Sequence, residues 1–372
     1  MKIGLIDGDL LGNGNHRFPN LALMKLSSYH KSIGNNVSLI LDYKSVVGGL
    51  FVEEYDKILI SKAFTWNNIP REILSMASVE TGGTGFEFDK AEPLPYEIEH
   101  SMPDYNLYNE FVRAKRISGQ KESSLKHYID YSVGFSTRGC FRGCGFCVLK
   151  NELKVNVHSP LSEFVDMDRK KIVMLDDNIL GCSKYPKIFD QIKELGKPFK
   201  YNQAMDIRLM TDKKAKMMLP LLYDGNYYFA FDLWKDREKV ERGLETWSRN
   251  YMELKSTKNN ILFLQTQLYC ICCYDHNNKY NIIFWKNDII FLFKRIEIIF
   301  KYKCLPFVMR FDEHKKSPFY GLYMAICQWS NQPRNCAKYS FNEYIEISNK
   351  REAIKIRDKY PEFSRLFDVR LK

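Results

Sequence analysis

The sequence predicts an α/β protein built from two successive alternations of strands and helices. The first observation is a set of short apolar runs at residues 2–6, 37–41 and 57–60, with helical spacing of apolar residues over 19–33. The second is that this alternation resumes at Tyr131, after a stretch rich in proline and charge. Strands that alternate with helices favour parallel sheets, whose ligands bind at the carboxyl ends of the strands.

The first alternation predicts a Rossmann-like domain, which we place together with its linker at residues 1–120. Its first strand ends in Asp7-Gly8-Asp9, a segment typical of the turn that follows a strand. Val79 leads into a glycine-rich turn over residues 81–85. Residues 90–130 contain prolines and show little periodicity, so we expect a connecting segment with short helices there.

The second alternation predicts a partial (β/α)6 barrel, which we place at residues 121–311. Its expected strands lie at residues 131–135, 172–175, 199–203, 227–231, 262–270 and 306–311. Its expected helices lie at residues 183–195, 212–222, 235–255 and 287–302. A closed parallel barrel has eight strands, so we expect an incomplete one. Residues 312–372 are rich in lysine and aromatic residues and are expected to form a partly helical C-terminal cap or tail.

Composition narrows the class of protein. The 372 residues are 45% hydrophobic and 27% charged, which favours a globular chain over a disordered one. There is no long uncharged apolar run and no secretory signal at the start, so we expect a cytoplasmic protein with no membrane partner. The formal net charge of +11 is compatible with a nucleic-acid partner, although a lysine-rich solvated surface explains it more simply.

Three cysteines carry the most specific chemical signal. Cys140, Cys144 and Cys147 follow an expected strand at C-x3-C-x2-C spacing, and the glycines between them permit a tight loop. Thiolates are the usual ligands of iron–sulfur clusters. Three cysteines leave one iron of a [4Fe-4S] cluster open, as a catalytic metal requires. The alternatives are a zinc knuckle that recruits a fourth ligand such as His158, or three unrelated cysteines.

This segment, with Phe146 before the last cysteine, resembles the signature of the radical S-adenosylmethionine (SAM) superfamily. The resemblance implies that SAM binds the open iron and that its adenine lies beside the backbone of Phe146. One electron, from a donor such as flavodoxin or ferredoxin, would then split SAM into methionine and a 5′-deoxyadenosyl radical that takes a hydrogen atom from the substrate. The cysteines would be both the metal ligands and the catalytic residues, because the bond cleavage takes place on the cofactors that they hold.

Later strand ends supply candidate SAM-binding residues. The polar run Asp176-Asp177-Asn178 occupies the position where the family often has a Gly-Gly-Glu type sequence that binds the SAM amino group. A polar run at this position is seen in cobalamin-type members of the family. The alternative role of these residues is to cap a helix N-terminus. Arg208 could pair with the SAM carboxylate. The remaining candidates are Asn202, Gln203, Asp232 and Arg310. For these four residues and for Arg208, the alternative is a solvated loop residue.

The N-terminal domain is similar to the cobalamin-binding-like domain that precedes many radical SAM barrels. The similarity rests on Asp7-Gly8-Asp9, residues 18–27, Ser61, the glycine-rich turn and Pro103-Asp104-Tyr105. The Asp-x-His-x-x-Gly motif of cobalamin-ligating domains is missing, and His16 lacks its spacing. Bound cobalamin is therefore an additional possibility that the resemblance allows.

The function that follows is reductive cleavage of SAM and hydrogen abstraction from an unidentified small molecule, peptide or nucleic acid. The alternatives are a cobalamin-dependent radical SAM methyltransferase and a non-catalytic iron–sulfur or nucleic-acid-binding protein. Cysteine often behaves as a small buried hydrophobe, and we expect this of the other cysteines. An auxiliary cluster is the alternative for three of them: Cys304, Cys327 and Cys336.

Overall fold

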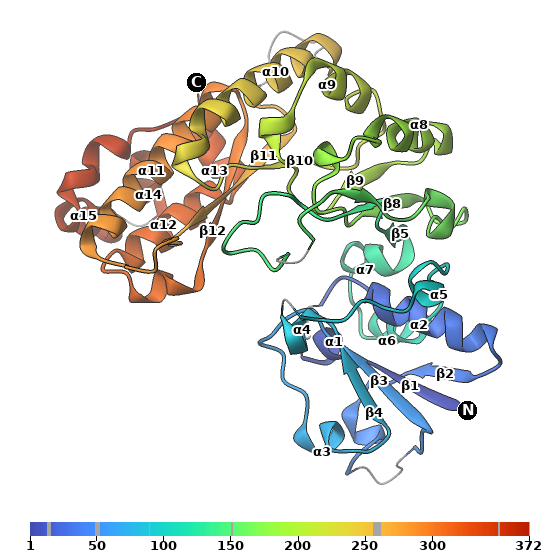
Figure 1. The fold of residues 1–372 in the computed structure, drawn as a ribbon. Coiled ribbons are helices and arrows are strands. Elements are labelled where there is room, and N and C mark those ends of the chain that lie inside the picture. The colour runs from blue at the N-terminus through green and yellow to red at the C-terminus, as the bar shows by residue number, and fades with distance from the viewer. Residues whose placement is uncertain are drawn as a thin grey trace. The chain divides into compact units, whose positions relative to one another are not determined.

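The computed structural model describes residues 1–12, 16–48, 53–88, 90–149, 152–255, 262–348 and 350–371. The chain divides into two compact units. Unit 1 comprises Met1–Gly143 and Cys147–Leu175, and unit 2 comprises Cys144–Phe146 and Asp176–Lys372. Both units are mixed α/β structures with parallel strands, as the sequence predicts (Figure 1).

Unit 1 contains a four-stranded parallel sheet. Its strands are β1 (Lys2–Asp7), β2 (Asn36–Leu39), β3 (Lys57–Ser61) and β4 (Val79–Gly82), in the order β2-β1-β3-β4 (Figure 1). Successive side chains of a strand point to opposite faces. Ile3 and Leu5 therefore enter one apolar cluster, whereas Ile6 enters another. The strands expected at residues 2–6, 37–41 and 57–60 are confirmed. The segment Val79–Gly82, where we expected the start of a glycine-rich turn, forms the strand β4.

Helices cover both faces of this sheet. The helices of this part of unit 1 are α1 (Gly8–Gly12), α2 (Leu21–Ser32), α3 (Arg71–Leu74), α4 (Thr84–Glu87), α5 (Tyr96–Glu99), α6 (Asn109–Ile117) and α7 (Glu122–Ile129). Helix α2 begins where Asn20 accepts a hydrogen bond from the Leu23 amide at 3.2 Å. The expected connecting segment does contain short helices, but α6 and α7 also bury Phe111, Leu125 and Tyr128 against the sheet. The segment is therefore part of the core of unit 1.

A second pair of parallel strands also lies in unit 1. Strand β5 (Tyr131–Gly134) pairs with β8 (Lys171–Met174), which confirms two of the expected barrel strands. Between them, β6 (Thr137–Arg138) and β7 (Asn156–Val157) form a short antiparallel ribbon that the sequence did not predict. Two residues per strand are too few to leave a hydrophobic period.

Unit 2 continues the alternation. Its elements are α8 (Tyr185–Leu195), β9 (Phe199–Tyr201), α9 (Asp212–Met218), β10 (Tyr227–Ala230), α10 (Arg237–Lys255), β11 (Thr266–Cys272), α11 (Ile282–Lys301) and β12 (Leu305–Arg310). Strands β10, β11 and β12 form a parallel sheet in that order. Helix α11 begins earlier than expected because Asn281 caps it, accepting from the Phe284 amide at 2.9 Å. The partial barrel stays a prediction, since its strands are divided between the two units.

The C-terminal segment packs onto α11. It contains α12 (Tyr320–Ser330), α13 (Pro333–Lys338), α14 (Phe341–Ser348) and α15 (Lys350–Lys359). Phe293 of α11 stacks on Trp329 of α12 at 6.5 Å between ring centroids and also contacts Phe341 and Phe367. The expected helical tail is thus confirmed and shares an aromatic core with unit 2. In the described part of the chain, no helix is both long and apolar enough to cross a membrane.

Candidate metal centre and its surroundings

The three cysteines of the spacing motif differ from all the others in exposure. Cys140, Cys144 and Cys147 are half-buried, whereas the other seven cysteines are buried. The Leu149 amide donates a hydrogen bond to Sγ of Cys147 at 3.5 Å, and the Cys140 amide donates to the Glu152 carbonyl at 2.8 Å. Accessible thiols can become thiolate ligands, whereas apolar burial disfavours the thiolate. The donor set present therefore fits a metal centre at these three positions.

Two glycines of this loop lie where a Cβ would clash with a neighbouring atom. Gly139 has a φ of +94°, and a Cβ there would clash with the Lys154 carbonyl oxygen. A Cβ at Gly145 would clash with the hydroxyl of Tyr274, a residue whose ring also contacts Phe146 edge-on at 5.2 Å between centroids. Because glycine has no Cβ, it adopts a positive φ and tolerates a close neighbouring atom without steric cost. The glycine spacing read from the sequence is thus explained by the tight course of the loop.

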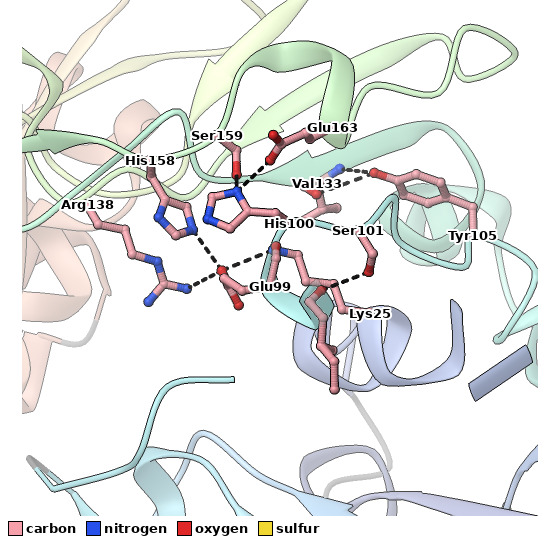
Figure 2. Close-up of polar contacts among 11 residues, drawn as sticks. Lys25, Glu99, His100, Ser101, Tyr105, Val133, Arg138, His158, Ser159 and Glu163 are labelled. Carbon is pink, nitrogen blue, oxygen red and sulfur yellow. Dashed lines mark hydrogen bonds and ion pairs between the residues drawn. The ribbon is translucent and has the colours of Figure 1, made fainter. Parts of the chain in front are cut away.

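A buried carboxylate supports the segment that leads into the loop (Figure 2). Oε1 of Glu99 accepts from Nζ of Lys25 at 3.0 Å and Nη2 of Arg138 at 3.1 Å, and it pairs with Nε2 of His158 at 2.8 Å. Lys25 and Glu99 are nearly buried, at 4% and 12% side-chain exposure. Burial alone would raise the pKa of Glu99, but the His158 hydrogen bond and the Lys25 and Arg138 charges lower this pKa to about 2.

This Glu99 cluster ties three distant segments of unit 1 together. Lys25 comes from α2, Glu99 ends α5, Arg138 ends β6, and His158 follows β7 (Figure 2). The His158 amide also donates to the Ser136 carbonyl at 2.9 Å. The ribbon that carries the motif toward Cys140 is therefore anchored to two helices. Sequence reasoning missed this cluster, although a lysine on the apolar face of the expected helix over 19–33 was a signal for it.

The zinc-knuckle alternative gains no support from His158. Its Nε2 is engaged by Glu99. The ligands of a single zinc ion must lie close together. Among the described residues, the group whose ligand atoms all lie within 4.8 Å of one another is Asp7, Asp9 and His16, and this group contains no cysteine. Thiolates of a [4Fe-4S] cluster instead bind different irons.

A small hollow in unit 2 brings several of the predicted residues together. It has a volume of about 30 Å³, and Cys144, Phe146, Arg208, Asp232 and Asp236 are among its lining residues. The guanidinium of Arg208 donates to Asp206 at 2.7 Å through Nε and to Asp236 at 2.6 Å through Nη1. A SAM carboxylate would therefore compete with two protein carboxylates for Arg208. The hollow has room for about one water molecule.

Asp232 stands where the sequence places it, directly after β10. Its Oδ1 accepts from the Ile271 amide at 3.1 Å. Burial raises the pKa of this carboxyl to about 6, against the opposing effects of the Ile271 amide and the Arg295 charge. Asp232 therefore exchanges a proton near neutral pH, a property often found in functional sites.

The other candidates occupy different environments. Asp176 and Asn178 are buried after β8, and Asn178 accepts from the Asp206 amide at 3.4 Å, beside the Arg208 ion pair. Asn178 makes no side-chain cap hydrogen bond to the turn that follows it, so the N-cap alternative is not supported there. The rest are dispersed: Asp177 is half-buried, Asn202 and Gln203 are exposed, and Arg310 contacts Met324 of α12.

The auxiliary-cluster alternative meets an electrostatic obstacle. Cys304, Cys327 and Cys336 are buried, and burial raises the pKa of the Cys304 thiol and brings that of Cys336 to about 12. For Cys327, a hydrogen bond with Cys272 raises the pKa most. Thiols held in the protonated state are poor metal ligands.

The N-terminal candidates for cobalamin binding are occupied by contacts within the chain. Asp9 accepts from the Ala63 amide at 2.6 Å, and His16 Nδ1 bonds to Tyr128 at 3.0 Å. A Cβ at Gly83 or Gly85 would collide with atoms of Lys62. The glycine-rich turn is thus explained by packing on the chain itself.

The fold and the cysteine loop define an α/β protein with a candidate iron–sulfur centre. Among solved structures, the chain is similar to the cobalamin-dependent SAM radical enzyme OxsB, with aqua-cobalamin bound (12% identity, TM-score 0.46) and in its apo, selenomethionine-labelled form (13%, 0.48). Each match covers 95% of this chain and 56% of OxsB, so the chain spans little more than half the length of that enzyme. No family model and no curated protein matches the sequence.

Proposed function

We propose that this protein is a radical SAM enzyme that binds a [4Fe-4S] cluster through Cys140, Cys144 and Cys147. The observation that carries the proposal is the contrast in cysteine environment. Three half-buried thiols lie on one glycine-dependent loop at the superfamily spacing, while the other seven are buried. In this reading the Rossmann-like domain and linker occupy residues 1–120, the partial barrel 121–311 and the C-terminal cap 312–372.

The protein's own residues would bind and orient the cofactors. When bound, cluster and SAM supply the one-electron cleavage that yields a 5′-deoxyadenosyl radical for hydrogen abstraction. Phe146 would lie beside the adenine, and the buried carboxyl of Asp176 and amide of Asn178 would face the SAM amino group, since a carboxylate beside an ammonium is favourable. Asp232, with a pKa of about 6, can hold or release a proton beside Phe146. The electron would come from a flavodoxin or ferredoxin.

Anaerobic reconstitution tests this proposal. We expect about four irons and four sulfides per chain, brown absorbance, and 5′-deoxyadenosine after addition of SAM and dithionite. Cys144→Ala should lose both cluster and product, because it removes a ligand. The matched control is Cys182→Ala, which removes a buried thiol of the same unit and should keep both.

Two results would overturn the proposal. A cluster that persists in Cys144→Ala refutes the ligand assignment. A wild-type protein that forms a cluster but leaves SAM intact is a non-catalytic iron–sulfur protein, and its affinity for nucleic acid is then the property to measure.

A further inference from the structure

We propose that a cavity at the carboxyl ends of β10 and β11 binds the ammonium group of a small organic molecule whose apolar body lies against aromatic side chains. The cavity has a volume of about 290 Å³ and lies within unit 2. Its polar lining includes Asp232, Asp288 and Arg295, and its aromatic lining includes Trp234, Tyr274 and Phe291. Small-molecule sites are concave and combine apolar or aromatic side chains with a few convergent polar groups.

Among the described residues, each of the two carboxyl groups has one oxygen that accepts no hydrogen bond. Oδ1 of Asp232 accepts from the Ile271 amide at 3.1 Å, and no hydrogen bond in the described part of the chain uses its Oδ2. Oδ2 of Asp288 accepts from the Cys273 amide at 2.8 Å and from the Tyr323 hydroxyl at 2.7 Å, and no residue that the structure describes donates to its Oδ1. Two such acceptors on one cavity match the several N–H donors of an ammonium group.

The guanidinium in the cavity lining bonds to backbone carbonyls through Nη1 and Nε. Arg295 of α11 is 2% exposed, and its Nη1 donates to the carbonyls of Phe231, Asp232 and Ile271. Its Nε donates to the Phe291 carbonyl at 3.3 Å. Arg295 thus links the carboxyl ends of β10 and β11 through their carbonyls, and its positive charge compensates the negative charge of one carboxylate. Two acidic groups against one basic group favour a cationic ligand over an anionic one.

The aromatic side chains suit the same ligand. Trp234 stacks on Phe291 at 5.5 Å between ring centroids, so the two rings form a rigid wall. Tyr274 is positioned by Phe146 and Phe311, at 5.2 and 5.0 Å between centroids. Aromatic rings attract cations through their negative faces. Lys294 and Arg237 also lie over Trp234, at 5.6 and 5.3 Å, and their charges at the surface are screened by solvent.

The position of the cavity connects it with the metal centre. Asp232 and Leu233 line both this cavity and the hollow that contains Cys144 and Phe146. A ligand here would therefore lie next to the residues that we assign to cofactor binding. The identification of this ligand as the substrate rests on the proposed function, whereas the affinity for an amine can be measured without turnover.

The test compares three ligands of similar shape and different charge: phenethylamine, 2-phenylethanol and phenylacetate. Binding to the full chain is measured by isothermal titration calorimetry at pH 7.5, before and after cluster reconstitution. We expect phenethylamine to bind at least about tenfold more tightly than the other two. Asp232→Asn keeps an acceptor for the Ile271 amide and should weaken amine binding about tenfold or more, which corresponds to about 1.4 kcal/mol.

Glu297→Gln is the matched control, because Glu297 is an exposed acid on α11 outside the cavity lining. It should bind phenethylamine as the wild type does. Equal affinity for the three ligands, tighter phenylacetate binding, or no binding of any ligand would overturn the inference. Amine binding without SAM cleavage would refute the proposed function alone, and SAM cleavage without amine selectivity would refute this inference alone.

Discussion

Nη2 of Arg138 donates to Oε1 of Glu99 at 3.1 Å, and Arg138 precedes Cys140 by two positions. Because Lys25 and His158 bond to the same oxygen, Glu99 is the common partner of three side chains (Figure 2). Loss of the carboxylate charge would leave the nearly buried Lys25 and the guanidinium of Arg138 without their counter-ion. Breaking such a pair by removing one partner is strongly destabilising.

We therefore expect Glu99→Gln to lower the free energy of unfolding by on the order of 3 kcal/mol, as measured by urea denaturation at pH 7. Iron content after reconstitution should fall with it, because β6 leads into the cysteine loop. Glu97→Gln, which changes an exposed acid on the same helix, should alter stability by less than about 0.5 kcal/mol. Equal stability of the two variants would show that the Glu99 cluster does not hold the ribbon.

The same carboxylate predicts an acid-dependent loss of stability. The pKa of Glu99 is about 2 in the fold against 4.5 ordinarily, so the folded state binds this proton less readily than the unfolded chain. Its contribution is complete above pH 4.5 and is lost as pH falls toward 2. The difference in unfolding free energy between wild type and Glu99→Gln should therefore shrink as the pH falls from 4.5 toward 2. A constant difference across that range would contradict this.

The Glu99 cluster also shows what the sequence reveals only in part. Strands β5 and β8 were predictable because each is a continuous buried run, and α2 because its apolar residues repeat at helical spacing. The cysteine loop was predictable because its signal lies within a few consecutive residues. By contrast, Lys25, Glu99, Arg138 and His158 meet only through the tertiary fold, and no local period records such a meeting.

The same distinction separates the two groups of site residues. Cys144 and Phe146 were predicted from the cysteine motif, Arg208 and Asp232 from the later strand ends, and all four line one hollow. The cavity beside it depends on Arg295 and Asp288 of α11, whose helical pattern gives no sign that two charged side chains face inward. Charged residues on a helix are usually assigned to its solvated face, so sequence reasoning passed over them.

The glycine at the entrance to the loop gives a second test. Gly139→Ala should reduce the iron bound after reconstitution at least about twofold, because alanine disfavours a φ of +94° and its Cβ would clash with Lys154. The measurement is iron per folded chain, with folding verified by circular dichroism. Gly321→Ala is the control, since a Cβ there meets nothing within 4 Å, and its iron content should match the wild type. Full cluster content in Gly139→Ala would refute the requirement for glycine.

Asp232 should lower the stability of the protein at neutral pH. Its pKa is about 6 in the fold against 3.8 ordinarily, so the folded state binds the proton more readily than the unfolded chain. Raising the pH from 3.8 to 6 therefore removes stability, and the cost is complete above pH 6. Asp232→Asn abolishes this ionisation while keeping an oxygen for the Ile271 amide. We expect the variant to be up to about 3 kcal/mol more stable than the wild type at pH 7.5 and equally stable near pH 4, as measured by urea denaturation. A variant that loses stability at pH 7.5 would show that the carboxylate is an integral part of the packing, whereas a gain in stability with weaker amine binding indicates that the charge is retained for function.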